Sequence, residues 1–327
     1  MNLLNTAFAR ALLLSAAAAG LPALACAQEK YPAKPITLVI PSVAGSIQDV
    51  VARVIGQEIT KAWGQPVIVE NKPGAGTTIG TRYVAAAPKD GYTALLTFTG
   101  HVQNPSFFPQ RGYDPVRDFA GVSKIGLSST VLVVSPDFPV RTLAEVVALV
   151  KAHPGKYAYG TYGAGTTGHI MGEQLKREAG LDMIAVHYKG GAPLSTDLVG
   201  GQVKIGYIAV GSALPLLKSG RLIPVAVGGS QRSPLLPTVA TFDEAGYKGF
   251  EMDAWMGLLV PAGTPKPRID ALSREIARIV RLPEIQQKLK DQAFDAVGGT
   301  PEDMDRVLRE DTEKWSRLIT QLGIKPE

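Results

Sequence analysis

The chain has 327 residues, 45% of them hydrophobic and 19% charged, which excludes a disordered chain, a collagen-like chain and a protein with many membrane spans. Lysine and arginine number 34 against 29 acidic residues, so the formal charge is +5. Because no concentrated basic stripe accompanies this excess, the charge argues against a nucleic-acid-binding protein and suits an anionic ligand slightly better than a cationic one.

The N-terminus has the pattern of a secretory signal. Arg10 precedes an apolar stretch from Ala11 to Ala25, and no acidic residue occurs before Ala27. We predict a signal peptide over residues 1–27, cleaved near Ala27, which would place the mature chain in the periplasm and remove the only cysteine, Cys26. A membrane anchor and a lipoprotein processed at Cys26 are the alternatives.

Short β-branched runs alternate with helix-period segments along the rest of the chain. Such runs are typical of parallel strands that are buried on both faces. Strands are expected over residues 36–40, 66–70, 93–98, 131–134, 157–161, 183–186, 203–207 and 222–227. The repeated β-α-β spacing predicts an α/β fold with two parallel sheets.

Two helix starts have clear capping signals. Thr142 and Glu145 form a capping-box pattern before a helix that should reach about residue 152. Thr300 followed by Pro301 predicts an N-cap and a first helical turn, with the helix ending near residue 322. The C-terminal portion is therefore expected to be mostly helical.

Motifs for catalysis are missing from the sequence. The four histidines, at positions 101, 153, 169 and 187, have no metal-ligand spacing, and the chain contains no HExxH, CxxC, Gly-x-Ser-x-Gly or Walker A pattern. We therefore expect no catalytic residue, no metal and no cofactor.

Three turns rich in small residues join a predicted strand to a predicted helix. They cover residues 43–49, 73–80 and 163–169. Glycine lets a ligand approach the backbone, and N–H groups at a helix N-terminus can hold an anion such as a carboxylate. Ordinary βα turns with capping Ser or Thr have the same composition, but three of them in one exported chain favour a ligand cleft at the carboxyl ends of parallel strands.

The third turn also matches a dinucleotide fingerprint. Its glycines at 163, 165 and 168 have the G-x-G-x-x-G spacing after a predicted strand. Asp182 lies roughly where a ribose-binding acid is sought, but it precedes a strand instead of ending one. An exported nucleotide-dependent oxidoreductase that uses the Gly163–Gly168 turn is the alternative function.

From Tyr31 onward the chain resembles the Bug family, the extracytoplasmic solute receptors of tripartite tricarboxylate transporters. The resemblance spans almost the whole mature chain, with the matching stretches in the expected order. These stretches are residues 31–36, 64–76, 90–92, 104–106, 113–116 with 118–119, 188–190, 200–202, 212–214 and 261–265.

The resemblance implies a periplasmic-binding-protein fold of type II-like organisation: two α/β lobes, two crossing strands and a ligand cleft between the lobes. Lobe one would comprise residues 28–125 and 230–327, and lobe two residues 126–229. The implied function is capture of a small carboxylate by cleft closure and delivery to a membrane permease with one large and one small subunit. We expect a monomer that binds no nucleic acid. Some members of the family lack a linked permease, so a ligand sensor without a transporter is a further alternative.

The family's ligand loops, carried over by position, give the candidate ligand-binding residues. They are Gly45, Ser46, Ile47, Gln48, Asp49, Thr97, Thr99, Gly100, His101, Gly163, Ala164, Gly165, Thr166, Thr167, His169, Tyr207 and Ile208. Two of them have a structural explanation as well: Asp49 is favoured by the dipole of its helix, and His169 could pack or cap.

Two departures from the family pattern bear on the ligand. Ser42, Val43 and Ala44 stand where the first loop usually has an aromatic residue and prolines, and Ile208 stands where lobe two often has an aspartate. A ligand ammonium buried against Ile208 would have no partner. We therefore predict a carboxylate whose far end is aromatic or otherwise apolar.

Overall fold

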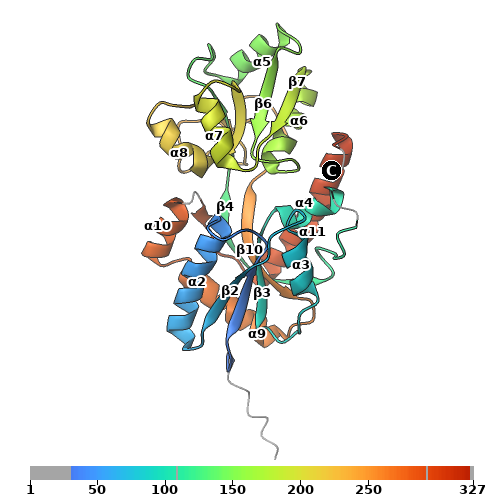
Figure 1. Cartoon of the computed structure of the whole chain (residues 1–327), viewed down its shortest axis with the longest axis vertical. Helices are drawn as coiled ribbons and strands as arrows, with labels where there is room; N and C mark the ends of the chain where they lie inside the picture. The colour runs from blue at the N-terminus through green and yellow to red at the C-terminus, as the bar shows by residue number, and fades with distance from the viewer. Residues whose placement is uncertain (1–30, 108–109, 292–293, 325–327) are drawn as a thin grey trace, which may run out of the picture. The chain divides into compact units, whose positions relative to one another are not determined.

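The computed structural model describes residues 31–107, 110–291 and 294–324. The predicted signal peptide and Cys26 lie outside the described residues. Contacts divide the chain into a unit of Met1–Ala33 and a unit of Lys34–Glu327. The second unit contains two β-sheets, one in each of two α/β lobes (Figure 1).

Lobe one is built on a six-stranded sheet. The order of its strands is β11-β4-β10-β3-β1-β2. Their bounds are β1 Ile36–Ile40, β2 Val67–Asn71, β3 Thr93–Phe98, β4 Phe119–Ser128, β10 Ala254–Pro261 and β11 Asp295–Ala296. Strand β1 is parallel to β2 and β3, whereas β10 is antiparallel to β3 and β4. The apolar run of β1 is buried over most of its length, as expected for a central strand covered on both faces.

Lobe two is built on a five-stranded sheet with the order β7-β6-β8-β5-β9. The strands are β5 Thr130–Val134, β6 Tyr157–Thr161, β7 Met183–His187, β8 Ile205–Ala209 and β9 Ile223–Val227. Strand β6 is parallel to β7 and β8, and β5 is antiparallel to β8 and β9.

The prediction of parallel sheets holds for β1 with β2 and β3 and for β6 with β7 and β8, but both sheets are mixed. Strands β4, β5, β10 and β11 run antiparallel to neighbours, and the sequence reading assigned no strand to β4 or β10. Only Ser129 separates β4 from β5, so this stretch passes directly from one sheet into the other. A buried apolar run does not report strand direction, which depends on the connection. The lobe boundaries at residues 125 and 229 stay a prediction.

Ten helices complete the described part of the unit. They are α2 Ile47–Trp63, α3 Thr78–Ala85, α4 Gly100–Phe107, α5 Leu143–Lys151, α6 Thr167–Ala179, α7 Gly191–Val199, α8 Val210–Lys218, α9 Lys266–Ile279, α10 Pro283–Asp291 and α11 Pro301–Gln321. Both predicted helix starts are confirmed. Thr142 and Glu145 form a complete capping box, and Thr300 caps α11 with Pro301 in the first turn.

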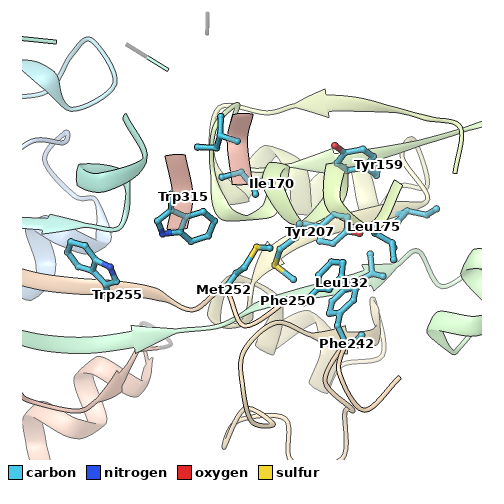
Figure 2. Packing of buried hydrophobic residues seen from close by; sticks show 14 of the residues in the cluster. Leu132, Tyr159, Ile170, Leu175, Tyr207, Phe242, Phe250, Met252, Trp255 and Trp315 are labelled. Carbon is cyan, nitrogen blue, oxygen red and sulfur yellow. The ribbon is translucent and has the colours of Figure 1, made fainter. Parts of the chain in front are cut away.

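One buried apolar cluster contains residues of both lobes. Figure 2 shows it from Trp255 on β10, past Met252, to Tyr207 on β8, with the rings of Phe242 and Phe250 beside Tyr207. These two phenylalanine rings stack with their centroids 4.4 Å apart. Trp255 is a core residue whose indole N–H donates to Asp311 at 2.8 Å. The segments that connect the two sheets therefore lie in a continuous core.

The two connecting segments are also tied to each other. Ser129, between β4 and β5, donates its hydroxyl proton to the carboxylate of Asp253 at 3.1 Å, immediately before β10. Burial raises the pKa of Asp253. This hydrogen bond holds the two crossing segments together where the chain passes from one lobe to the other.

Candidate functional site

The turn between β1 and α2 has its helix N-terminus occupied by the chain's own side chains. Ser46 is the N-cap, and its Oγ accepts from the backbone N–H of Asp49 at 3.3 Å. The Asp49 carboxylate in turn accepts from the N–H of Gly45 at 2.9 Å. A carboxylate therefore already lies where an anionic ligand would have to bind.

Asp49 is held in its charged form. Its carboxylate lies 2.9 Å from the guanidinium of Arg53, one helical turn further along. The hydrogen bond from Arg53 and the backbone bond from Gly45 lower the pKa of Asp49 despite its burial. Ile47 and Gln48 belong to the first turn of the same helix, and Gln48 is buried. The five residues predicted from this turn lie together, and their contact with a ligand stays a prediction.

The turn between β2 and α3 has a strained backbone. Gly74, Ala75, Gly76 and Thr77 all have positive φ angles, of 123°, 46°, 57° and 77°. A β-branched residue such as Thr77 rarely adopts this conformation, and strain of this kind persists only where neighbours enforce it. Asn104, on α4, enforces it here: its amide donates to Thr77 Oγ1 at 2.8 Å and to the Gly76 carbonyl.

This second turn is absent from the predicted set of ligand-binding residues. The first turn of α3 has no acidic residue, and Thr77 makes no side-chain cap bond with any described residue. The sequence contained a signal, because the run from Pro73 to Gly80 is one of the three small-residue turns. Its brace, Asn104, is 27 residues away along the chain and could not be found from a local pattern.

The turn between β6 and α6 has a helix N-terminus without an acidic side chain, where the first-turn N–H of Gly168 donates to the Tyr162 hydroxyl at 3.2 Å. Thr166 is at the N-cap position but makes no side-chain cap bond within the described chain, because its hydroxyl donates instead to the Gly163 carbonyl at 2.7 Å. The first turn of α6 contains no acidic residue. Gly165, with φ of +69°, donates its N–H to His169 Nδ1 at 3.0 Å. This is the predicted turn best suited to hold a carboxylate through backbone N–H groups.

The glycine spacing of this turn has a packing explanation. A Cβ on Gly168 would lie 2.9 Å from the ring of Tyr162 and 3.1 Å from Tyr207, and one on Gly172 would lie 2.1 Å from Tyr159. Helix α6 can therefore approach the sheet closely only with glycine at these positions. Strand β7 ends at His187, where a dinucleotide fold would need an acid, and Asp182 precedes this strand. These features weigh against the oxidoreductase alternative.

Helix α4 brings lobe one against the β6–α6 turn. Gln103 donates to Thr167 Oγ1 at 3.4 Å. Phe107 packs so close to Gly165 that a Cβ on this glycine would lie 3.0 Å from the phenylalanine ring. A cavity of about 280 Å³ lies beside this contact. It is lined by Asn104, Phe107, Ala164, Gly165, His169, Glu173, His187, Leu322, Gly323 and Ile324. Three predicted site residues, Ala164, Gly165 and His169, thus lie with residues of α4, α6 and the end of α11.

The predicted residues at the end of β3 are buried in lobe one. Thr99 accepts from the N–H of Trp255 at 2.7 Å, and Thr97 pairs with β10 inside the sheet. His101 is fully buried against Tyr113 and Phe119, with Nε2 3.0 Å from the Pro115 carbonyl. Burial lowers the pKa of His101 to about 4. Contact of these residues, and of Gly100 beside them, with a ligand stays a prediction.

Tyr207 and Ile208 lie inside a strand. The strand expected over residues 203–207 runs instead from Ile205 to Ala209, so the two side chains point to opposite faces of the sheet. Tyr207 is fully buried against Tyr159, and burial raises the pKa of its hydroxyl. Ile208 is fully buried in a second apolar cluster with Val131 and Leu194. Their contact with a ligand also stays a prediction.

Within residues 31–107, 110–291 and 294–324, no group of three or more His, Cys, Asp or Glu side chains is arranged to hold a metal ion. No helix in the same ranges is both long and apolar enough to cross a bilayer.

The comparisons with known proteins agree with one another. The family model described as "Tripartite tricarboxylate transporter family receptor" matches residues 51–324. Protein BugT of Bordetella pertussis is 31% identical over 299 residues, covering 91% of this chain and 92% of BugT.

Two solved structures from Rhodopseudomonas palustris contain dicarboxylates. Rpa4515 with adipate is 32% identical with a TM-score of 0.80, covering 91% of this chain and 100% of that one. MatC with bound malate is 29% identical with a TM-score of 0.74, covering 88% of this chain and 100% of MatC. The chain thus belongs to the family of tripartite tricarboxylate transporter receptors, which includes the Bug proteins, and has their periplasmic-binding-protein fold.

Proposed function

We propose that this protein is a periplasmic receptor that captures a small carboxylate and delivers it unchanged to a tripartite tricarboxylate-type permease. The observation that carries the proposal is the full-length likeness to relatives solved with adipate and with malate. Residues 1–27 would be removed on export, and the mature protein would act as a monomer. The membrane subunits, one large and one small, would have to be separate chains.

The electrostatics of the turns support a carboxylate as ligand. At the β6–α6 turn the N-cap threonine makes no cap bond and the first helical turn has no acidic residue, and the β2–α3 turn has the same two features. A carboxylate bound between backbone N–H groups needs no lysine or arginine. The β1–α2 turn, with Asp49 already in place, would contact the ligand through groups other than its helix N-terminus.

Closure of the lobes would complete the site. Lobe one approaches the β6–α6 turn through Gln103 and Phe107, and the segments around Ser129 and Asp253 connect the lobes. A ligand shifts the receptor toward the closed form only by contacts that the open form lacks. A carboxylate held by turns of both lobes meets this requirement.

The far end of the ligand is proposed to be apolar or aromatic. Ile208 contributes no charged acceptor to lobe two, and Phe107, Leu322 and Ile324 add apolar surface beside the β6–α6 turn. The acidic residue among the cavity's lining residues, Glu173, is already paired with Lys176 at 2.8 Å. An amino acid would need a partner for its ammonium group, and burying an unpaired ammonium costs more than the roughly 2–7 kcal/mol of an unpaired neutral polar group. Tight binding of aspartate or glutamate would contradict this part of the proposal.

A thermal-shift screen of residues 28–327 tests the function. The protein would be unfolded and refolded to remove any carried ligand, then mixed with adipate, malate, aromatic acids, their neutral amides, acidic amino acids and NAD. A ligand at a hundred times its Kd adds about 2.7 kcal/mol, enough to raise the midpoint by a few degrees. Stabilisation by a carboxylate but not by its amide is the expected result.

Two other outcomes would contradict the receptor proposal or narrow it. Stabilisation by NAD alone, followed by turnover of NAD(H) with any substrate, would establish the oxidoreductase instead. A carboxylate that binds but is taken up equally by cells with and without the protein would favour a sensor over a transport receptor.

A further inference from the structure

Two histidines hold the β6–α6 turn at two of its glycines, Gly163 and Gly165. His169 Nδ1 accepts from the Gly165 N–H at 3.0 Å, and His169 is 8% exposed. Since Nδ1 is the acceptor, the proton of the neutral ring is on Nε2. His169 thus fixes the second glycine from within its own helix, one turn further along.

His187 fixes the first glycine through Thr161. The Thr161 hydroxyl donates to the Gly163 carbonyl at 3.0 Å and accepts from the Gly163 N–H at 3.3 Å. Its oxygen also lies 3.0 Å from His187 Nδ1. Because the hydroxyl proton is used on Gly163, His187 Nδ1 must be the donor. The rings of His169 and His187 are in contact, with centroids 4.3 Å apart.

The turn needs such external bonds because glycine does not fix its own backbone. Gly163 and Gly165 have φ angles of 154° and 69°, and glycine loses more conformational entropy on ordering than any other residue. A turn that is ordered before the ligand arrives binds more tightly than one that must become ordered on binding. Bonds to Gly165 therefore bear on affinity even when the bonding side chain does not touch the ligand.

We propose that His169 is a positioning residue, which holds Gly165 through Nδ1 so that the carboxylate-binding turn is preformed, and does not contact the ligand. This inference rests on the proposed function. It also gives His169 a role that differs from the direct contact implied by the family resemblance.

The surroundings of His169 keep it a hydrogen-bond acceptor. Burial, and then His187, lower the pKa of His169 to about 4. Glu173 opposes this effect, but it is paired with Lys176 at 2.8 Å and accepts from Tyr159 at 2.6 Å. Helix α4 approaches the turn with the uncharged Gln103, Asn104 and Phe107. The ring is therefore neutral at ordinary pH, and the bond to Gly165 persists.

Two conservative variants separate positioning from direct contact. In His169→Asn, the side-chain oxygen can take the place of Nδ1, whereas in His169→Gln the polar end reaches the place of Nε2. We expect His169→Asn to keep the Kd for adipate or malate, whichever binds the wild type, within about threefold. His169→Gln and His169→Ala should weaken binding about tenfold to a hundredfold, because the Gly165 bond is lost and the turn must become ordered on binding.

The reverse order of affinities would overturn the proposal. If His169→Gln binds like the wild type and His169→Asn does not, Nε2 touches the ligand. His153→Asn is the matched control. His153 is exposed just after α5, away from the β6–α6 turn, and its Nδ1 lies 3.0 Å from the Leu149 carbonyl of that helix. The thermal midpoint of each variant, measured without ligand, shows whether a loss of affinity reflects a loss of fold.

Hydrogen exchange of the ligand-free protein tests the same bond without any ligand. The Gly165 amide should be protected in the wild type and in His169→Asn, and should exchange at least tenfold faster in His169→Ala. An unprotected Gly165 amide in the wild type would overturn the proposal. If no carboxylate binds the wild type, the proposed function fails, and the exchange measurement still decides whether His169 positions the turn.

Discussion

The β1–α2 turn of lobe one and the β6–α6 turn of lobe two each join glycine and a hydroxyl residue to a helix N-terminus. In the first, Ser46 caps the helix and Asp49 places an ionised carboxylate there. In the second, the Thr166 hydroxyl turns back to Gly163 and the first helical turn has no acid. Similar composition therefore produces one helix N-terminus that is already neutralised and one that can accept an anion.

The difference lies in two side chains. A Ser or Thr at the N-cap either caps the helix, as Ser46 does, or bonds within the turn, as Thr166 does, and in α6 the Tyr162 hydroxyl accepts from the Gly168 N–H instead. An acid three residues later then either fills the helix N-terminus or leaves it open. Adding an acid to the α6 N-terminus should therefore lower its affinity for an anion, and removing the acid of α2 should make that helix less stable.

The largest effect is expected from Thr166→Asp, which places an acidic side chain at the N-cap of α6. The new carboxylate should cap the helix and raise the free energy of unfolding by about 1 kcal/mol. The same charge should repel a ligand carboxylate by about 3 kcal/mol, a loss of affinity of roughly a hundredfold. Urea unfolding and calorimetric titration with adipate or malate would measure the two effects.

Thr166→Asn is the matched control, because asparagine caps a helix without a charge. It should stabilise the fold similarly and lose less than about tenfold in affinity. If both variants weaken binding equally, the charge is irrelevant and the α6 N-terminus does not hold the carboxylate.

The second effect is a difference in pH dependence between the turns. His169 has a pKa of about 4 against 6.5 when exposed, so the unfolded chain takes up the proton first as the pH falls. The free energy of unfolding should therefore fall between pH 6.5 and 4, by at most about 1.4 kcal/mol per pH unit for this residue. The buried His101 adds a contribution of the same sign. Asp49, whose pKa is lowered below 3.8, should cost stability only in stronger acid.

Urea unfolding at pH 7, 6 and 5 measures this slope. His169→Asn should reduce the slope by about half relative to the wild type, whereas Asp49→Asn should leave it unchanged in this range. The comparison of variants also removes the opposing effect of Asp253 and Asp311, whose pKa values are raised by burial. An unchanged slope in His169→Asn would show that its ring is protonated as readily in the folded protein as in the unfolded chain.

The third effect is a difference in stability between alanine variants of two asparagines that each hydrogen-bond to a turn of lobe one. Asn104→Ala removes the bonds that hold Gly76 and Thr77 in the left-handed region, and should cost about 2 kcal/mol of unfolding free energy. Asn71 donates to the Ser42 carbonyl at 3.2 Å beside the β1–α2 turn, where only Gly45 has a positive φ. Asn71→Ala should cost less than about 1 kcal/mol. Equal losses in urea unfolding would mean that the β2–α3 turn stores no strain.

Local sequence patterns predicted most of the fold. Short apolar or aromatic runs located β1, β3 and β6, and the capping box located α5, because each of these signals lies within a few residues. Two crossing strands were expected from the family resemblance alone, and local patterns located neither β4 and β10 nor the short helix α4. Their direction and pairing depend on contacts far along the chain, such as Trp255 with Thr99, 156 residues apart.

The candidate site was predictable only in outline. Glycine and hydroxyl residues marked all three turns, but composition could not show that Ser46 caps its helix while Thr166 does not. Asn104 could not be recognised as the brace of Thr77, because 27 residues separate them. Which groups remain open to a ligand is decided by side-chain hydrogen bonds, and these depend on rotamers that the sequence does not specify.

The smallest effect on binding is expected from Asp49→Asn, which removes the charge at the α2 N-terminus. Asparagine can still accept from the Gly45 N–H, but the ion pair with Arg53 and the charge interaction with the helix dipole are lost. The free energy of unfolding should therefore fall by about 1 kcal/mol. Affinity for the carboxylate should change by less than about threefold, because the β6–α6 turn holds the anion. A tenfold loss by calorimetric titration would mean that Asp49 contacts the ligand, as the family resemblance implies. A tenfold gain would mean that its charge repels the ligand, so that both turns face the same carboxylate.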